Sequence, residues 1–199
     1  MYHSADEAKT TRMDALRDRA QSCTRCGLWE SRTNAVVGSG CLDAEIVLVG
    51  EAPGRTEDES GLPFVGRAGK LLDDILGKAG LSREDVFIMN VVKCRPPNNR
   101  RPKKGEVDTC ERFIAEQLDI IRPRMVAPMG NSSISYFFEK HGLGKAVVGD
   151  VHGVEYEIEA GWGVFKLVPL YHPAAAIYNR RLVEELERDM KRLVGLEGP

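Results

Sequence analysis

Short apolar runs recur along this chain, and a helical pattern separates each run from the next. The runs cover residues 45–50, 86–92, 125–129 and 165–170. The helical patterns cover residues 68–79, 107–121, 132–141 and 179–194. Strands that alternate with helices form a mostly parallel sheet covered by helices on both faces. The sequence therefore predicts an α/β fold, a three-layer α/β/α sandwich, with a hairpin or edge strand added by residues 151–163.

The bulk properties indicate one domain spanning residues 1–199. A chain of 199 residues can bury enough apolar surface to fold without disulfides. No run approaches the roughly 20 apolar residues that span a bilayer, so a soluble, cytoplasmic protein without membrane contact is expected. A formal net charge of −2 argues against a protein that coats nucleic acid through bulk electrostatics, but it leaves room for a local basic patch.

Four of the five cysteines are predicted to hold a metal centre. Reduced intracellular thiols favour metal ligation over disulfides. Cys23 and Cys26 form a tight Cys-x-x-Cys pair, whereas Cys94 and Cys110 stand far apart, which suits a cubane iron–sulfur cluster better than a zinc ribbon. Either of the later two could instead be a small buried hydrophobe, and Cys41 is interpreted as the spare cysteine. The cluster is expected to be structural.

Polar residues follow each of the four predicted strands. In open parallel sheets, ligands bind beyond the carboxyl ends of the strands. The residues at these ends are Gly50, Glu51, Ala52, Pro53 and Gly54, then Asn90, then Gly130, Asn131 and Ser132, and finally His172 and Pro173. We therefore expect one polar rim. Taken alone, however, Asn90 could be a turn residue and His172 a structural histidine.

The first of these loops has the composition of a ligand-binding loop but not of a phosphate-binding one. It lacks Gly-Lys-Ser/Thr, and its carboxylates would repel phosphate. An acidic run at this place is also typical of a solvated turn or a helix N-terminus. Phe64 follows in a Gly- and Pro-rich segment, where it could be a stacking plate for a base or a core residue.

Together these motifs resemble the iron–sulfur type of uracil-DNA glycosylase, family 4. The resemblance is carried by residues 50–58, 63–66, 90–97 and 172–175 with the four cysteines, and it runs from Cys23 to about Arg181. It implies a helix-covered sheet, a [4Fe–4S] cluster on Cys23, Cys26, Cys94 and Cys110, and excision of uracil from single- or double-stranded DNA in base excision repair. A noncatalytic iron–sulfur module that binds nucleic acid is the alternative, and an electron-transfer protein is a third hypothesis.

The resemblance assigns uracil recognition to Asn90. One carboxamide can accept from uracil N3–H and donate to O4, whereas cytosine reverses this pattern. His172 would stabilise the leaving uracilate at O2. The implied uracil-binding set is Glu51, Ala52, Pro53, Phe64, Asn90 and His172. His172, Glu57 and Glu51 are the implied catalytic residues. Better-known uracil glycosylases carry an aspartate that positions water at the place of Ala52. In this chain, backbone groups would hold the water instead, assisted by Glu51 or Glu57. Glu57 would also line the pocket near uracil C5 and exclude the methyl group of thymine.

A basic loop beside this rim is predicted to contact DNA phosphates, although it could be merely solvated. The predicted DNA-binding residues are Lys93, Arg95, Arg100, Arg101 and Arg180. Ile177 or Tyr178 is expected to be the wedge that enters the duplex. The loop contains no histidine, so ordinary turnover rather than covalent trapping is expected, and no lysine motif indicates lyase chemistry. A monomer is expected at the nucleoid, with recruitment by a sliding clamp left open.

Overall fold

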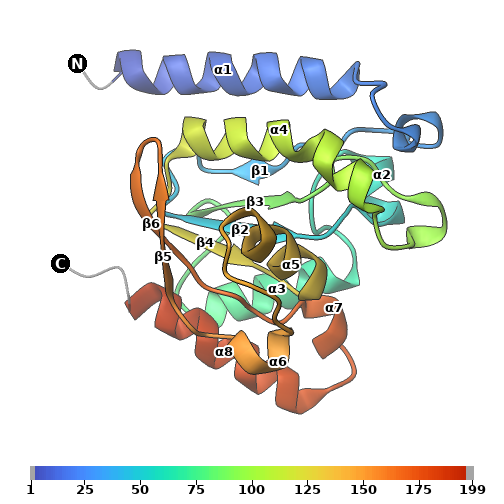
Figure 1. Cartoon of the computed structure of the whole chain (residues 1–199). Helices are drawn as coiled ribbons and strands as arrows, with labels where there is room; N and C mark the ends of the chain where they lie inside the picture. The colour runs from blue at the N-terminus through green and yellow to red at the C-terminus, as the bar shows by residue number, and fades with distance from the viewer. Residues whose placement is uncertain (1–2, 196–199) are drawn as a thin grey trace.

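A six-stranded sheet forms the centre of the computed structural model, which describes residues 3–195 (Figure 1). The strands are β1 (Ser39–Gly40), β2 (Ile46–Gly50), β3 (Val86–Asn90), β4 (Met125–Pro128), β5 (Tyr156–Ala160) and β6 (Gly163–Leu167). Their order is β1-β3-β2-β4-β6-β5. The four inner strands run parallel, and the edge strands β1 and β5 are antiparallel to their neighbours. The predicted mostly parallel sheet is confirmed.

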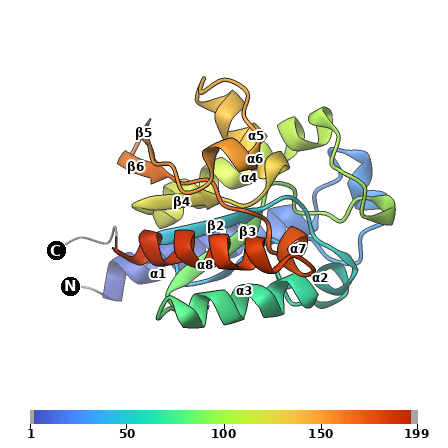
Figure 2. The same ribbon diagram turned by 90° about the horizontal axis from the view of Figure 1, so that it is seen from below.

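Helices cover both faces of this sheet, as the α/β/α prediction required (Figures 1 and 2). The helices are α1 (His3–Gln21), α2 (Arg55–Ser60), α3 (Arg67–Lys78), α4 (Lys104–Ile121), α5 (Asn131–Lys140), α6 (Val148–Val151), α7 (Pro173–Ala176) and α8 (Arg180–Gly195). Helices α1, α4 and α5 pack on one face, and α3 and α8 pack on the other. Among the residues described, no helix is long and apolar enough to cross a membrane.

The sheet divides the apolar core into two clusters. Successive side chains of a strand point to opposite faces, so Phe87 of β3 packs toward α1 and α4 while Ile88 packs toward α3 and α8. All residues of β2, β3 and β4 are buried. Burial on both faces explains why these strands appear in the sequence as continuous apolar runs rather than alternating ones.

Strand register brings the carboxyl ends of the inner strands to one edge. Gly50 at the end of β2 pairs with Asn90 at the end of β3. Beyond β4 and β6, an isolated parallel bridge joins Met129 to Leu170, two residues before His172. The four predicted polar segments therefore begin at the same edge.

The differences from prediction lie in short elements. The last inner strand begins at Gly163 and ends at Leu167, so it takes in the glycine that was predicted to form a turn. For the acidic run, the interpretation as a helix N-terminus agrees with the structure, because Glu57 and Asp58 lie in the first turn of α2. Residues 1–2 and 196–199 of the predicted domain lie outside the described residues.

Candidate functional site

The side chain of Asn90 ends β3 in an almost closed environment. It is 2 % exposed, and its Oδ1 is buried with no hydrogen-bond partner among the described residues. A Cβ at position 50 would lie 2.4 Å from this oxygen and 2.6 Å from Cζ of Phe64, so only glycine lets the three residues meet. A buried acceptor without a donor costs roughly 1–3 kcal/mol. Such an atom is suited to accept a hydrogen bond from a ligand.

Phe64 is held in a backbone conformation that non-glycine residues rarely adopt. Its φ is 53°, in the left-handed region. Arg83 donates to the carbonyl oxygens of Pro63, at 3.0 Å, and of Phe64. Asp73 fixes the Arg83 guanidinium at 2.6 Å. The result is a phenyl ring whose centroid lies 5.5 Å from that of His172, with the two planes tilted by 30°.

The carboxylate of Glu57 binds backbone amides of the loop that carries Phe64. Its Oε1 accepts hydrogen bonds from the amides of Val65, at 2.9 Å, and Gly66, at 2.8 Å. These amides precede α3, where a carboxylate is favourable for the helix dipole. Glu57 thus ties α2 to the loop that carries Phe64. This role was not predicted from the sequence.

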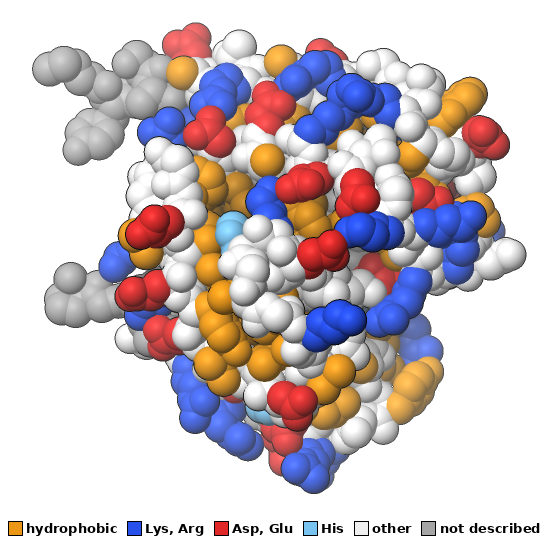
Figure 3. Space-filling view, in the orientation of Figure 1, with side chains coloured by type: hydrophobic (Ala, Val, Ile, Leu, Met, Phe, Trp, Pro, Cys, Tyr) orange, Lys and Arg blue, Asp and Glu red, His pale blue; other side chains and the backbone are white. Residues whose placement is uncertain are grey.

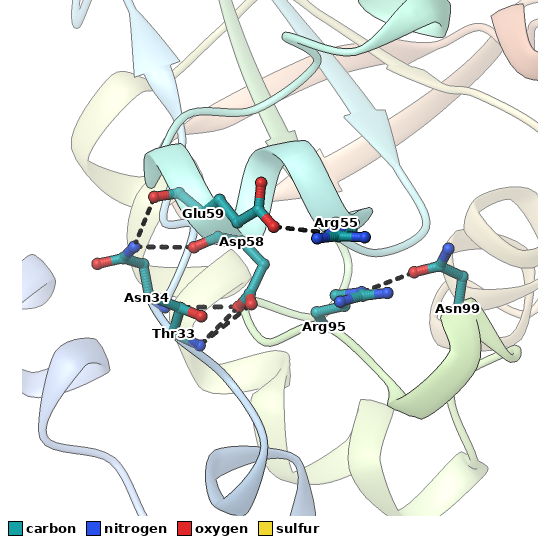
Figure 4. A network of polar contacts seen from close by, with 7 residues as sticks. All are labelled: Thr33, Asn34, Arg55, Asp58, Glu59, Arg95 and Asn99. Atoms are coloured by element: carbon teal, nitrogen blue, oxygen red, sulfur yellow. Dashed lines mark hydrogen bonds and ion pairs between the residues drawn. The ribbon is translucent and has the colours of Figure 1, made fainter.

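Asp58, the next residue, anchors α2 on its other side. Its buried carboxylate accepts from the amide of Thr33, at 2.9 Å, and Asn34 donates its side-chain amide to the carbonyl of Asp58 (Figure 4). The same view includes the pairs formed by Arg55 with Glu59 and by Arg95 with Asn99. The segment just after the Cys-x-x-Cys pair is therefore bound directly to the site.

The imidazole of His172 has a defined protonation state and tautomer. Burial lowers its pKa from 6.5 to about 4, so the ring is neutral at pH 7. Its Nδ1 accepts a hydrogen bond from the amide of Ala174 at 3.1 Å. A neutral ring that accepts at Nδ1 carries its proton on Nε2. His172 is therefore a neutral donor at the strand-end rim.

Glu51 lies at the lip of an open groove of about 530 Å³ beside this rim. The groove is also lined by Val91, which follows β3, and Ser132, in the first turn of α5. Arg101 approaches the Glu51 carboxylate to 3.9 Å. Ala52 and Pro53 connect Glu51 to α2, and Pro53 is buried. Of the two predicted carboxylates, Glu57 accepts hydrogen bonds from backbone amides, whereas Glu51 accepts none from the residues that the structure describes.

The four predicted metal ligands meet at one small cavity. Cys23 and Cys26 come from the turn after α1, Cys94 follows β3, and Cys110 comes from α4. Within residues 3–195, no group of three or more His, Cys, Asp or Glu side chains is placed to hold a single metal ion. A cubane cluster needs no such convergence because each cysteine binds a different iron. Cys41 does not line the cavity, as expected of the spare cysteine.

Cations, rather than acids, surround these sulfurs. Arg32 donates to Sγ of Cys94 at 3.1 Å, and Arg112 donates to Sγ of Cys23 at 3.4 Å. Burial raises the pKa of Cys110 to about 11, and nearby Lys93 acts in the opposite direction. Metal ligation requires thiolates, and positive neighbours favour thiolates over thiols. The donor set and its charges fit an iron–sulfur cluster.

The prediction that Lys93 contacts DNA is wrong. Its side chain is 1 % exposed, and its ammonium donates to the backbone carbonyl of Asn90 at 2.8 Å. Burial also lowers its pKa to about 8. A basic residue in a basic segment appeared solvated in the sequence, but the chain turns it inward.

The rest of the basic loop is partly neutralised by acids from other segments. Arg100 forms a two-pronged ion pair with Glu106, which lowers the pKa of that carboxyl group. Lys104 pairs with Glu139 of α5. Figure 3 shows acidic and basic side chains interspersed over this face. Arg95 donates a hydrogen bond to the side chain of Asn99, and the exposed Arg101 lies beside Glu51 of the rim.

Of the two wedge candidates, Tyr178 is the exposed one. It is 82 % exposed, whereas Ile177 is half-buried. Arg67, at the start of α3, donates to its hydroxyl at 2.6 Å and stacks over its ring at 5.1 Å. Tyr178 is thereby placed beside the segment that carries Phe64. Arg180 is also exposed and pairs with Glu184.

Comparison with known proteins gives a consistent family. Residues 37–193 match the model of the uracil DNA glycosylase superfamily. A type-4 uracil-DNA glycosylase of Archaeoglobus fulgidus is 45% identical over 94% of this chain and 94% of its own length. Those of Sulfurisphaera tokodaii and Saccharolobus solfataricus are each 44% identical over 91% of this chain, and over 83% and 84% of their own lengths. The chain belongs to the type-4 uracil-DNA glycosylases.

Sequence reasoning missed the members of this type-4 site that act through backbone groups or sulfurs. Arg83, Arg32 and Arg112 stand in no motif, and each contacts a partner distant in sequence. Asp58 lies within the motif of residues 50–58, but its contact with Thr33 was not predicted. Only the acidic run around Asp58 carried a signal, and it was interpreted as a turn or helix N-terminus. Contacts between distant segments leave no periodic pattern in a single sequence.

The state of His172 gives a pH prediction. Because its pKa is about 4, uracil excision should show no inflection near 6.5 and should fall only as pH drops toward 4. The unfolded chain takes up a proton at higher pH than the folded one. The stability due to neutral His172 is therefore full above 6.5 and declines below it.

Single-turnover rates between about pH 4 and about pH 8 would test this, with ¹⁵N NMR of the imidazole to identify the tautomer. An ionisation of His172 near 6.5, or a proton found on Nδ1, would contradict the assignment.

Proposed function

We propose that this chain hydrolyses the N-glycosidic bond of uracil in DNA and leaves an abasic site. The observation that carries the proposal is the buried, unpaired Oδ1 of Asn90, which lies against Gly50 and Phe64 at the strand-end rim. Uracil N3–H is a donor of the right kind for that oxygen, and the Asn90 amide can donate to uracil O4. Cytosine offers no donor at N3 and would leave the oxygen unpaired, which a polar site rejects strongly.

The neutral imidazole of His172 supplies the leaving-group interaction. As the bond between uracil N1 and C1′ breaks, negative charge collects on the base, including O2. An Nε2–H donor aimed at O2 stabilises that charge without first transferring a proton. Phe64, fixed beside His172, provides the face on which the base stacks.

Hydrolysis also requires water at C1′ and negative charge near the oxocarbenium-like sugar. We assign both tasks, holding the water and supplying the negative charge, to Glu51. Ala52 and Pro53 would shape the loop that adjoins the base. Glu51 lines the open groove, whereas Glu57 already accepts two backbone amides. Glu57 then contributes by holding the Phe64 loop rather than by acting on water.

The cysteines are proposed to hold a [4Fe–4S] cluster as a structural centre. Cys23, Cys26, Cys94 and Cys110 would be its ligands, and when bound it joins the N-terminal turn to the segment after β3. Lys93 lies next to the site, but its ammonium is engaged by the carbonyl of Asn90. This supports a monofunctional glycosylase rather than one that forms a Schiff base at C1′.

The DNA contacts are proposed to run along the same rim. Arg95, Arg100, Arg101 and Arg180 would meet phosphates, and Tyr178 would fill the space left by the extruded nucleotide. Such an enzyme would act at the nucleoid in the cytoplasm. The monomeric state and recruitment by a sliding clamp stay predictions.

Substitution of Asn90 is the direct test of function. Protein of measured iron content should release uracil from a labelled duplex and should leave matched thymine and cytosine duplexes intact. Asn90→Ala should lower kcat/KM for uracil by at least about 100-fold because both edge contacts are lost. Alkali cleavage of the abasic product measures the rate. Unchanged DNA binding with no excision by either protein would instead support the noncatalytic module.

Tyr178→Ala separates the wedge from the base pocket. Removal of the ring should slow excision from duplex DNA by about tenfold or more, and should hardly affect single strands, which need no unpairing. Val164→Ala, an exposed change on β6, is the control. Equal losses on both substrates would show that Tyr178 serves the pocket instead.

Cysteine substitutions test the cluster. Cys110→Ser should remove most of the bound iron and sulfide and lower the melting temperature, because one of four ligands is lost. Cys41→Ser should keep its iron and sulfide and its melting temperature, since Cys41 lies outside the cavity. Iron retained by Cys110→Ser, or lost by Cys41→Ser, would contradict the ligand set.

A further inference from the structure

Lys93 is a buried ammonium with an unusual set of partners. Its Nζ donates to the carbonyl oxygen of Asn90 at 2.8 Å and lies 3.8 Å from Sδ of Met89. Within residues 3–195, it forms no ion pair with a carboxylate, and the titratable groups that face it are the side chains of Cys94 and Cys110. A buried charge is costly unless it is compensated and hydrogen-bonded. An apolar side chain of similar length would fill this position without that cost.

The backbone of Lys93 is tied to the cysteine side of the molecule. Its amide donates to Sγ of Cys110 at 3.3 Å, and its carbonyl accepts from the amide of Val36 at 2.7 Å. On the other side, the amide of Val91 donates to the carbonyl of Gly50 at 2.9 Å. The four residues from Asn90 to Lys93 therefore span the distance between the base-reading rim and the metal ligands.

We propose that Lys93 is a positioning residue, which holds the main chain of Asn90 from the side of the cysteine cavity and so fixes the carboxamide that recognises uracil. The inference rests on the proposed role of Asn90. Recognition of the N3–H and O4 edge of uracil depends on the position of the Asn90 side chain. No hydrogen bond from the described residues holds its Oδ1 in place. A side chain anchored only through its backbone is displaced when that backbone relaxes.

Lys93→Met tests this because it keeps the length of the side chain and removes its donor. Free uracil binding by calorimetry measures base recognition without catalysis, and binding of abasic DNA measures the remaining interface. We expect about tenfold weaker uracil binding, kcat/KM lowered by about 10–100-fold, and unchanged abasic DNA affinity and iron content. Lys93→Gln, which keeps a donor, should recover part of the uracil affinity.

Gln117→Leu is the matched control. Gln117 is also buried and also donates to a backbone carbonyl, that of Val37, at 2.9 Å. It should lose stability but not uracil affinity. Wild-type uracil affinity in Lys93→Met overturns the proposal. Loss of iron in both Lys93 variants also overturns it, because Lys93 would then serve the metal centre alone.

Asn90→Ala, measured in parallel, keeps the two proposals apart. If Asn90→Ala retains uracil affinity, the assignment of Asn90 itself is wrong and Lys93 has nothing to position. If Asn90→Ala loses uracil binding while Lys93→Met does not, only the inference about Lys93 fails.

Discussion

The close approach of Asn90, Gly50 and Phe64 at the ends of two parallel strands is the constraint on which the rest of the site depends. Strand register places Gly50 opposite Asn90, and any larger residue at 50 would collide with the carboxamide and the phenyl ring. Phe64 reaches this place only with a positive φ, and Oδ1 of Asn90 remains unpaired. Each feature costs of order 1–3 kcal/mol. Such costs gather where a ligand can offset them.

The groups around this point divide into those that hold and those that bind. Glu57 and Arg83 hold backbone atoms of the loop between α2 and α3, and Asp58 ties α2 to the backbone of Thr33. In contrast, Oδ1 of Asn90 and Nε2 of His172 have no hydrogen-bond partner among the described residues. A site in which the supporting side chains are paired and the recognising atoms are free is preorganised. That division is the reason Glu57 is better suited to support than to catalysis.

The pattern of apolar residues was sufficient to predict the sheet, because strands buried on both faces leave continuous apolar runs. Since ligands bind beyond the carboxyl ends of parallel strands, the same pattern predicted that Asn90 and His172 lie at one rim. The direction in which a side chain points after the end of a strand could not be predicted from the sequence. Lys93 stands among basic residues and was expected to face DNA, yet its side chain is buried and donates to the carbonyl of Asn90. Its amide donates to Cys110, which lies on a helix that follows later in the sequence. In the sequence, Arg100 appeared to have no ion-pair partner, because Glu106, the carboxylate that it pairs with, comes after the basic run. A single sequence carries no record of which charges meet across the fold.

The two halves of the molecule meet different electrostatic requirements with the same chain. The cysteine cavity is surrounded by Arg32, Arg112 and Lys93, whose positive charges favour thiolates. In the proposed reaction, the rim presents a neutral imidazole, that of His172, to a base that becomes negative as its bond breaks. A protonated His172 would attract phosphate and solvent as strongly as uracilate, and it would lose the Nδ1 acceptor that fixes its ring. Burial lowers the pKa of His172, and the hydrogen bond from the amide of Ala174 fixes the tautomer and orientation of the ring. In the proposed reaction, the donor is therefore set before uracil arrives. Since the net charge of the chain is close to zero, this separation depends on placement and not on composition.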